Sequence, residues 1–137
     1  MQLPPGEEAK RWLAEAASDM DTARYLVEGR RFNTACFIAQ QAAEKAVKAF
    51  LYGCGVEEPW GHSVDALIED ALSYDATLAD IRDLGPVLDK YYIPTRYPNG
   101  LPGGIPSRAF TADDARQALN TADQVVRAVG QRLPRLA

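Results

Sequence analysis

The stretch from Ala35 to Gly53, ACFIAQQAAEKAVKAFLYG, constrains the fold more than any other part of the chain. At the 100° per residue of an α-helix, its apolar side chains fill an arc wider than half the circumference. One neighbouring helix cannot cover such an arc, so we expect a central helix surrounded by others. Small side chains would allow a neighbouring backbone to approach one flank closely. They recur every seven residues, as Ala35, Ala42 and Ala49.

The same helix carries a narrow polar arc made of Gln41, Glu44, Lys45 and Lys48. Glu44 and Lys48 have the spacing and order of a favourable ion pair, and Lys48 is most simply part of a solvated face. Gln40 instead interrupts the apolar arc. Because a buried amide needs hydrogen-bond partners, we expect Gln40 to bond the YYIPTRYP segment or the same helix of a second subunit.

Apolar residues at helical spacing predict helices on both sides of this stretch, and no strand-like alternation occurs. The predicted helices run from the acids Glu7 and Glu8 to Gly29, from Ser63 to Leu72, from Leu78 to Leu88 and from Thr111 to Leu133. Asn33 is a good N-cap for the central helix, and Gly85-Pro86 should kink or restart the fourth. The prolines and glycines of residues 94–106 exclude a helix there.

We therefore expect an all-α fold, an antiparallel up-and-down bundle of four main helices plus a short helix. A Pro/Gly-rich loop precedes the last helix. The length of 137 residues fits one domain, residues 1–137.

Charge and composition exclude several classes of protein. The net charge of -4 argues against general coating of nucleic acid, but residues 53–90 carry nine acids and residues 91–137 carry six arginines. An anionic ligand should therefore prefer the C-terminal third or the polar arc. One histidine and two cysteines predict no metal site, no disulfide framework and no cofactor. No apolar run reaches the ~20 residues of a membrane span, and no signal peptide is evident, so we expect the cytoplasm.

Four pieces follow one another along the sequence: AEAASDMDTARYLVEGRRFNTACFIAQQAAEKAVKAFLYGCG, GHSVDAL, LDKYYIPTRYP and TADDARQALNTADQVV. In this order they resemble the HEPN domain, and the resemblance covers nearly the whole chain. Its most specific parts are CFIAQQAAEKAVKAFL and YYIPTRYP. The resemblance implies a helical bundle that often forms homodimers and is often encoded beside, or fused to, a minimal nucleotidyltransferase. It also implies nucleotide or RNA binding. Many members are metal-independent ribonucleases or toxins, which use an arginine and a histidine separated by four to six residues.

That ribonuclease motif is absent from this chain. The positions where an arginine would precede His62 hold Val56, Glu57 and Glu58, and those where a histidine would follow Arg96 hold Leu101, Pro102 and Gly103. We therefore expect a non-catalytic HEPN protein that binds a partner nucleotidyltransferase, a nucleotide or RNA in a toxin-antitoxin-like system. The alternative is a metal-independent ribonuclease that combines His62 and Arg96 in another way.

The expected ligand contacts are Arg96, Tyr97, Tyr92, Lys48 and Gln40. An arginine beside aromatic rings on a stiff loop could hold a phosphate and stack a base. Equally, the tyrosines could only attach the loop to the bundle. His62 precedes a serine N-cap and is most simply a residue that forms local hydrogen bonds. Trp12 and Trp60 are expected to pack in the core or at an interface.

Overall fold

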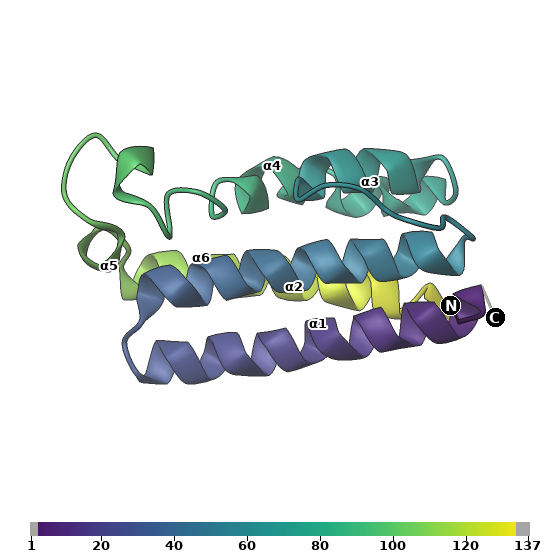
Figure 1. The fold of residues 1–137 in the computed structure, drawn as a ribbon, viewed down its shortest axis with the longest axis horizontal. Helices are drawn as coiled ribbons and strands as arrows, with labels where there is room; N and C mark the ends of the chain where they lie inside the picture. The colour runs from purple at the N-terminus through teal and green to yellow at the C-terminus, as the bar shows by residue number, and fades with distance from the viewer. Residues whose placement is uncertain (1–2, 134–137) are drawn as a thin grey trace.

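The computed structural model describes residues 3–133, in which all regular secondary structure is helical. This confirms the all-α class. The elements, shown in Figure 1, are α1 (Pro5–Glu28), α2 (Phe32–Gly53), α3 (Val64–Leu72), the 3₁₀ helix η1 (Ala76–Ile81), α4 (Leu84–Asp89), the 3₁₀ turn η2 (Pro98–Gly100), α5 (Pro106–Ala109) and α6 (Ala112–Gly130).

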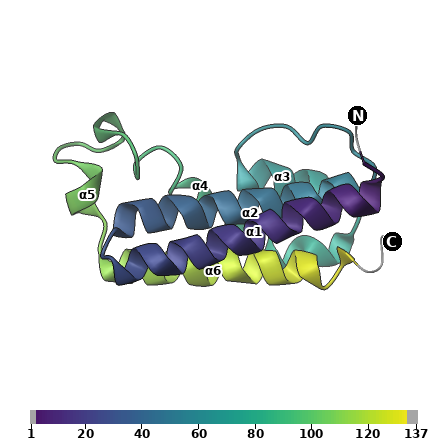
Figure 2. The same cartoon turned by 60° about the horizontal axis from the view of Figure 1, so that its bottom comes forward.

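Four helical segments, α1, α2, η1 with α4, and α6, run along the bundle in alternating directions. α1 and α2 form an antiparallel hairpin, η1 and α4 return along the opposite side of α2, and α6 runs back beside α2 (Figures 1 and 2). α3 is the additional short helix. It follows a connection, residues 54–63, that leads from the end of α2 back towards its middle.

Helix α2 lies at the centre, as its apolar arc predicts. It packs against α1, α6, α3 and α4, and Phe50 and Leu51 are among its large buried side chains. Six alanines of α2 are fully buried, and their small side chains allow the neighbouring helices to pack closely. They are Ala35, Ala39, Ala42, Ala43, Ala46 and Ala49. The helices of this same chain therefore cover the wide apolar arc, and the arc requires no second subunit.

Local sequence signals set most helix boundaries. Thr111 and Asp114 form a reciprocal capping box at the start of α6. The predicted fourth helix restarts at Leu84, after η1, because Pro86 is compatible with the first turn of a new helix. Gly85 permits this packing, since a Cβ there would lie 2.6 Å from Cα of Asp65.

One predicted boundary is wrong. α2 begins at Phe32, so Asn33 lies inside its first turn and is not the N-cap. The Asn33 amide instead donates to the backbone carbonyl of Thr95, 3.0 Å away. This long-range bond connects the start of α2 to the loop that follows α4.

The two cysteines are free thiols. Cys36 is buried in α2, and this burial raises its pKa from 9.0 to about 12, so the thiol stays protonated and packs as a small apolar group. No helix among residues 3–133 combines the length and hydropathy that crossing a bilayer requires.

Candidate functional site

The segment that contains YYIPTRYP folds into a compact turn against α2. Thr95 is buried, and its hydroxyl donates to the backbone carbonyl of Tyr91. The Asn33 amide holds the carbonyl of Thr95, as described above. The backbone N–H groups of Arg96 and Tyr97 both donate to the carbonyl of Ile93 at 3.1 Å. These bonds fix the backbone from which Arg96 projects.

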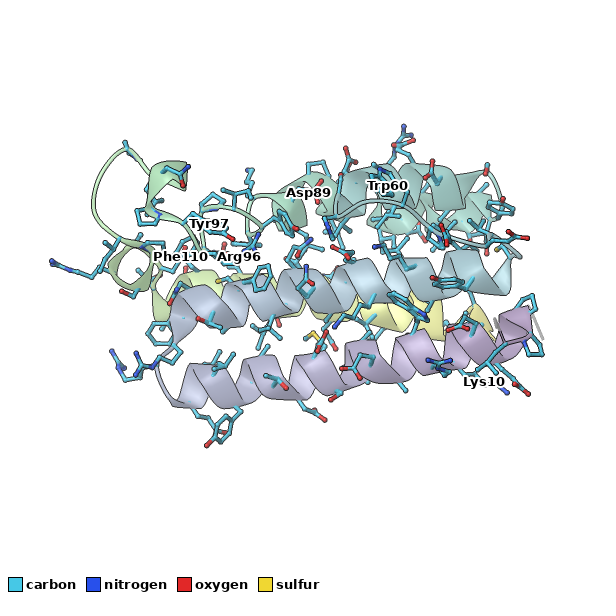
Figure 3. The ribbon with its side chains drawn as sticks, in the orientation of Figure 1. Lys10, Trp60, Asp89, Arg96, Tyr97 and Phe110 are labelled. Carbon is cyan, nitrogen blue, oxygen red and sulfur yellow. The ribbon has the colours of Figure 1, made fainter. Side chains whose placement is uncertain are left out.

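Arg96 lies among three aromatic rings. Its guanidinium carbon is 4.3 Å from the ring centre of Phe37, 4.5 Å from that of Tyr92 and 5.0 Å from that of Tyr97. Its Nε donates to the backbone carbonyl of Tyr92 at 2.8 Å. Figure 3 shows Arg96 and Tyr97 towards the end of the bundle where α2 begins. Within residues 3–133, the two Nη nitrogens of Arg96 have no hydrogen-bond or ion-pair partner.

His62 reaches the same place from the connection that doubles back along α2. The Gln40 amide donates to its backbone carbonyl at 3.0 Å. Its imidazole stacks on Tyr92, with ring centres 5.1 Å apart and planes 18° from parallel. His62 and Arg96, although far apart in the sequence, therefore both contact the Tyr92 ring.

The buried carboxylate of Glu44 contacts the imidazole of His62. The Nδ1 of His62 lies 3.2 and 3.3 Å from the two carboxylate oxygens of Glu44. The buried ammonium of Lys48 lies 3.1 Å from the same carboxylate, and the Gln41 amide donates to it at 3.3 Å. Gln41 also donates to the side-chain oxygen of Gln40 at 2.8 Å, which completes a polar network beneath His62.

This network sets the chemistry of the imidazole. A carboxylate accepts hydrogen bonds, so the Nδ1 that faces Glu44 carries a proton, and in a neutral imidazole Nε2 is then the acceptor nitrogen. The side chain of His62 is 60% exposed, and it lines a surface hollow of about 400 Å³ together with Tyr92 and Lys90. Nε2 can therefore accept a hydrogen bond or a proton from a ligand in this hollow.

Asp89 also borders the hollow, but its carboxylate is engaged. It accepts from the hydroxyl of Ser63 and from the backbone N–H of Val64, both at 2.6 Å. A carboxylate thus already occupies the N-terminus of α3, where the helix dipole favours negative charge. Among the described residues, no group of three or more histidine, cysteine or acidic side chains is arranged to hold a metal ion.

Several expectations about single residues are wrong. Lys48 is not on a solvated face, because it is buried, although its predicted pairing with Glu44 is confirmed. Gln40 bonds His62 and Gln41, and not the YYIPTRYP segment. Trp60 is 91% exposed, which excludes the core position expected for it, while the alternative of an interface stays a prediction. Trp12 packs against Tyr52, with ring centres 5.1 Å apart.

Glu44 is a site residue that the sequence patterns did not single out, although a signal was present. Gln40, Glu44 and Lys48 follow one another at intervals of four and therefore form one polar stripe on α2. A polar stripe on an otherwise apolar helix can mark a solvated face or a buried network. His62, the only histidine of the sequence, follows a glycine-containing turn. It was the one signal that a polar side chain could cover this stripe.

Comparison with known proteins identifies similar chains. The family model described as HEPN domain matches residues 9–133. A protein of Methanocaldococcus jannaschii named "Putative toxin MJ1304" is 26% identical over 131 residues, which cover 88% of this chain and 85% of that protein.

Solved structures have the same fold. TT1696 from Thermus thermophilus is 37% identical with a TM-score of 0.86, and the match covers 91% of this chain and 98% of that one. ST0689, described as an archaeal HEPN homologue, is 35% identical with a TM-score of 0.77, covering 92% and 98%. A HEPN domain protein from Thermotoga maritima is 28% identical with a TM-score of 0.70, covering 91% and 98%.

The buried network predicts an uneven response to mutation. Changing Glu44→Ala leaves the ammonium of Lys48 buried without its partner, which should lower the free energy of unfolding by about 3 kcal/mol. The matched control is Asp19→Ala, which removes the partner of Lys45 from a pair of 2.7 Å nearer the surface and should cost less than about 1 kcal/mol. Urea denaturation of both variants measures the difference, and equal losses would contradict the account of the network.

Proposed function

The chain belongs to the HEPN domain family, and from this premise we propose that it is a binding module that holds a phosphate of a nucleotide or of RNA. The site is the surface formed by Arg96, Tyr92, Tyr97 and His62. We assign direct contact to these residues. Lys48 and Gln40 are buried and act on the site indirectly. Gln40 bonds the backbone of His62, and Lys48 pairs with Glu44, which contacts the His62 ring.

The state of the Arg96 guanidinium carries this proposal. Aromatic faces and the bond from Nε to Tyr92 fix its plane, while the Nη nitrogens keep their N–H donors for a ligand. A fixed guanidinium with free donors matches the geometry of phosphate oxygens and loses little side-chain entropy on binding. A purely structural arginine would instead direct these donors to acceptors of its own chain.

The aromatic rings favour a ligand that also carries a base. Tyr97 is half exposed beside the guanidinium, and Tyr92 borders the hollow that His62 lines. Proteins that bind single-stranded RNA stack its bases on such rings and hold its backbone with neighbouring cations. The site therefore suits a nucleotide or a short single-stranded RNA better than inorganic phosphate.

The distribution of charge supports the same end of the bundle. Residues 29–43 and 90–112 contain no acidic residue but five cations: Arg30, Arg31, Lys90, Arg96 and Arg108. The turn between α1 and α2 and helix α5 lie together at this end (Figures 1 and 2). The nearby acids Asp113 and Asp114 are engaged within the first turns of α6, with Arg116 and with Thr111. Phosphate is attracted to this end and repelled by the acidic residues 53–89.

The biological setting is proposed from the family and its named relative. We infer a toxin-antitoxin-like system in which a minimal nucleotidyltransferase is the partner, supported by the resemblance and by the word toxin in the relative's name. The single-domain organisation and the cytoplasmic location remain proposals of the same kind.

A homodimer is also proposed, from the family alone, because the apolar arc of α2 is covered within the chain. Sedimentation velocity at micromolar concentration should give a species of twice the 15.0 kDa chain mass. A monomer alone would contradict this part of the proposal.

Binding of RNA gives the direct test of the site. A fluorescein-labelled oligonucleotide of single-stranded uridines should bind the wild-type chain, and Arg96→Ala should weaken binding at least about tenfold through loss of charged hydrogen bonds. Its melting temperature should fall only slightly, since the ring contacts of a part-exposed guanidinium contribute about 1 kcal/mol.

Arg82→Ala is the matched control, because it removes an equal charge from the acidic side, where Arg82 pairs with Glu69. It should bind as the wild type does. No binding by the wild type, or equal weakening by the two variants, would contradict a phosphate site at Arg96.

The contact between Glu44 and His62 favours a second candidate, a metal-independent ribonuclease. The Nε2 of His62 could take the proton of a ribose 2′-hydroxyl while Arg96 stabilises the charge that develops on the phosphate. Glu44 would hold the imidazole in the required tautomer. The product would be a 2′,3′-cyclic phosphate, and the leaving 5′-oxygen would take its proton from water or from a group of a second subunit.

This candidate requires cleavage of RNA in the presence of a metal chelator. Cleavage should disappear in both His62→Ala and Arg96→Ala, while Glu44→Gln, which keeps the shape of the side chain, should reduce it. Gel analysis of a labelled RNA measures all three. Activity that survives either alanine variant, or no activity in a folded wild-type chain, rules out this candidate and leaves the binding module.

A further inference from the structure

A second surface, on the acidic side of the bundle, combines an exposed tryptophan with exposed carboxylates. Trp60 is 91% exposed, and Tyr74, at the end of α3, is 54% exposed. Both line a groove of about 330 Å³ together with Pro59, Glu58 and Asp70. Figure 3 shows Trp60 well along the long axis from Arg96, so this groove is separate from the phosphate site.

The backbone holds Trp60 outward. Gly55 and Gly61 both have a φ of 94°, a conformation that side-chain-bearing residues rarely adopt, and they bound the segment that contains Pro59 and Trp60. Pro59 further restricts this segment. The exposure of Trp60 is therefore a property of a defined turn, although the indole makes almost no contact with the core.

The carboxylates beside it are available. Glu58 and Asp70 are exposed, and neither forms an ion pair with a cation of residues 3–133. Their surroundings are acidic as well, since residues 53–89 contain nine acids and Arg82 as the one arginine or lysine. Arg82 is itself paired with Glu69. Within residues 3–133, no cation competes for these two carboxylates with a cation from outside the chain.

We propose that this groove binds an arginine or lysine side chain of a basic segment in a partner protein. The face of an indole attracts a guanidinium or ammonium, and flanking carboxylates complete the recognition by charge and hydrogen bonds. The small volume fits one side chain with its neighbours and not a whole helix. The negative field excludes RNA and anionic lipid, and exposed tryptophan and arginine are the residues that most often dominate protein interfaces.

A labelled peptide tests the proposal. The probe is a fluorescein-labelled ten-residue peptide with four arginines spaced by glycine and serine, and its control replaces each arginine with glutamine. In fluorescence polarisation at moderate salt, the wild-type chain should bind the arginine peptide and not the glutamine peptide. Trp60→Ala should weaken binding about two- to fivefold through loss of the cation–π contact, without a change in melting temperature.

Two matched controls separate the groove from general electrostatics. Tyr25→Ala removes another aromatic side chain, 75% exposed on α1, and should bind as the wild type does. The double variant Glu58→Gln with Asp70→Asn should bind the arginine peptide more weakly, and its affinity should depend less on the salt concentration. Asp80→Asn with Asp83→Asn changes the net charge equally outside the groove and should have little effect.

Three results would overturn the proposal: no binding by the wild type, equal binding by wild type and Trp60→Ala, or equal weakening by the two neutralised pairs. Self-association that Trp60→Ala abolishes would also overturn it, since the occupant would then be a second copy of this chain. None of these results depends on whether Arg96 binds phosphate.

Discussion

The burial of one charged group, the Glu44 carboxylate, is the constraint on which the site depends. A carboxylate enters the interior of a helical bundle at acceptable cost only when cations and donors surround it. Lys48 supplies the charge from the next turn of α2, Gln41 supplies a donor, and the third partner is the imidazole of His62. The connection after α2 must therefore return along that helix. This return sets where α3 begins and places the only histidine of the chain at the surface hollow.

Tyr92 joins this network to the loop that follows α4. Its ring contacts His62 and Arg96, and its carbonyl accepts the Nε–H of Arg96. The bond from Asn33 to Thr95 then attaches the same loop to the start of α2. Two segments with little regular structure thus gain fixed positions from a rigid central helix, which is the usual way that a loop acquires a defined binding geometry. The segments that carry the other basic residues lie at the same end of the bundle, whereas the acidic residues follow the connection and the helices after it.

Much of the fold could be predicted from the sequence, because a buried helix such as α2 has small and apolar residues at helical spacing. The helix start at Thr111 and the kink or restart at Gly85-Pro86 are equally local signals and were predicted. A solvated position for Lys48 and a core position for Trp60 were wrong for a common reason, while an interface position for Trp60 stays a prediction. Whether a polar stripe or a tryptophan is covered depends on where a distant connection runs, and this is not encoded near either residue. Arg96, Tyr97 and Tyr92 were selected because they lie together on one proline-rich loop, but the convergence of His62 on the Tyr92 ring follows only from the fold.

An anionic ligand should bind where Arg96 lies and avoid the acidic side of the bundle. The most direct measurement is a titration of the isotope-labelled chain with short single-stranded RNA, followed by two-dimensional nitrogen–proton NMR. We expect the chemical shifts of residues 29–43 and 90–112 to change most, together with the Nε–H signal of Arg96 and the ring of His62. Chemical-shift changes concentrated in residues 53–61 and 64–89, with the Arg96 signal unaffected, would contradict binding of the anionic ligand at Arg96.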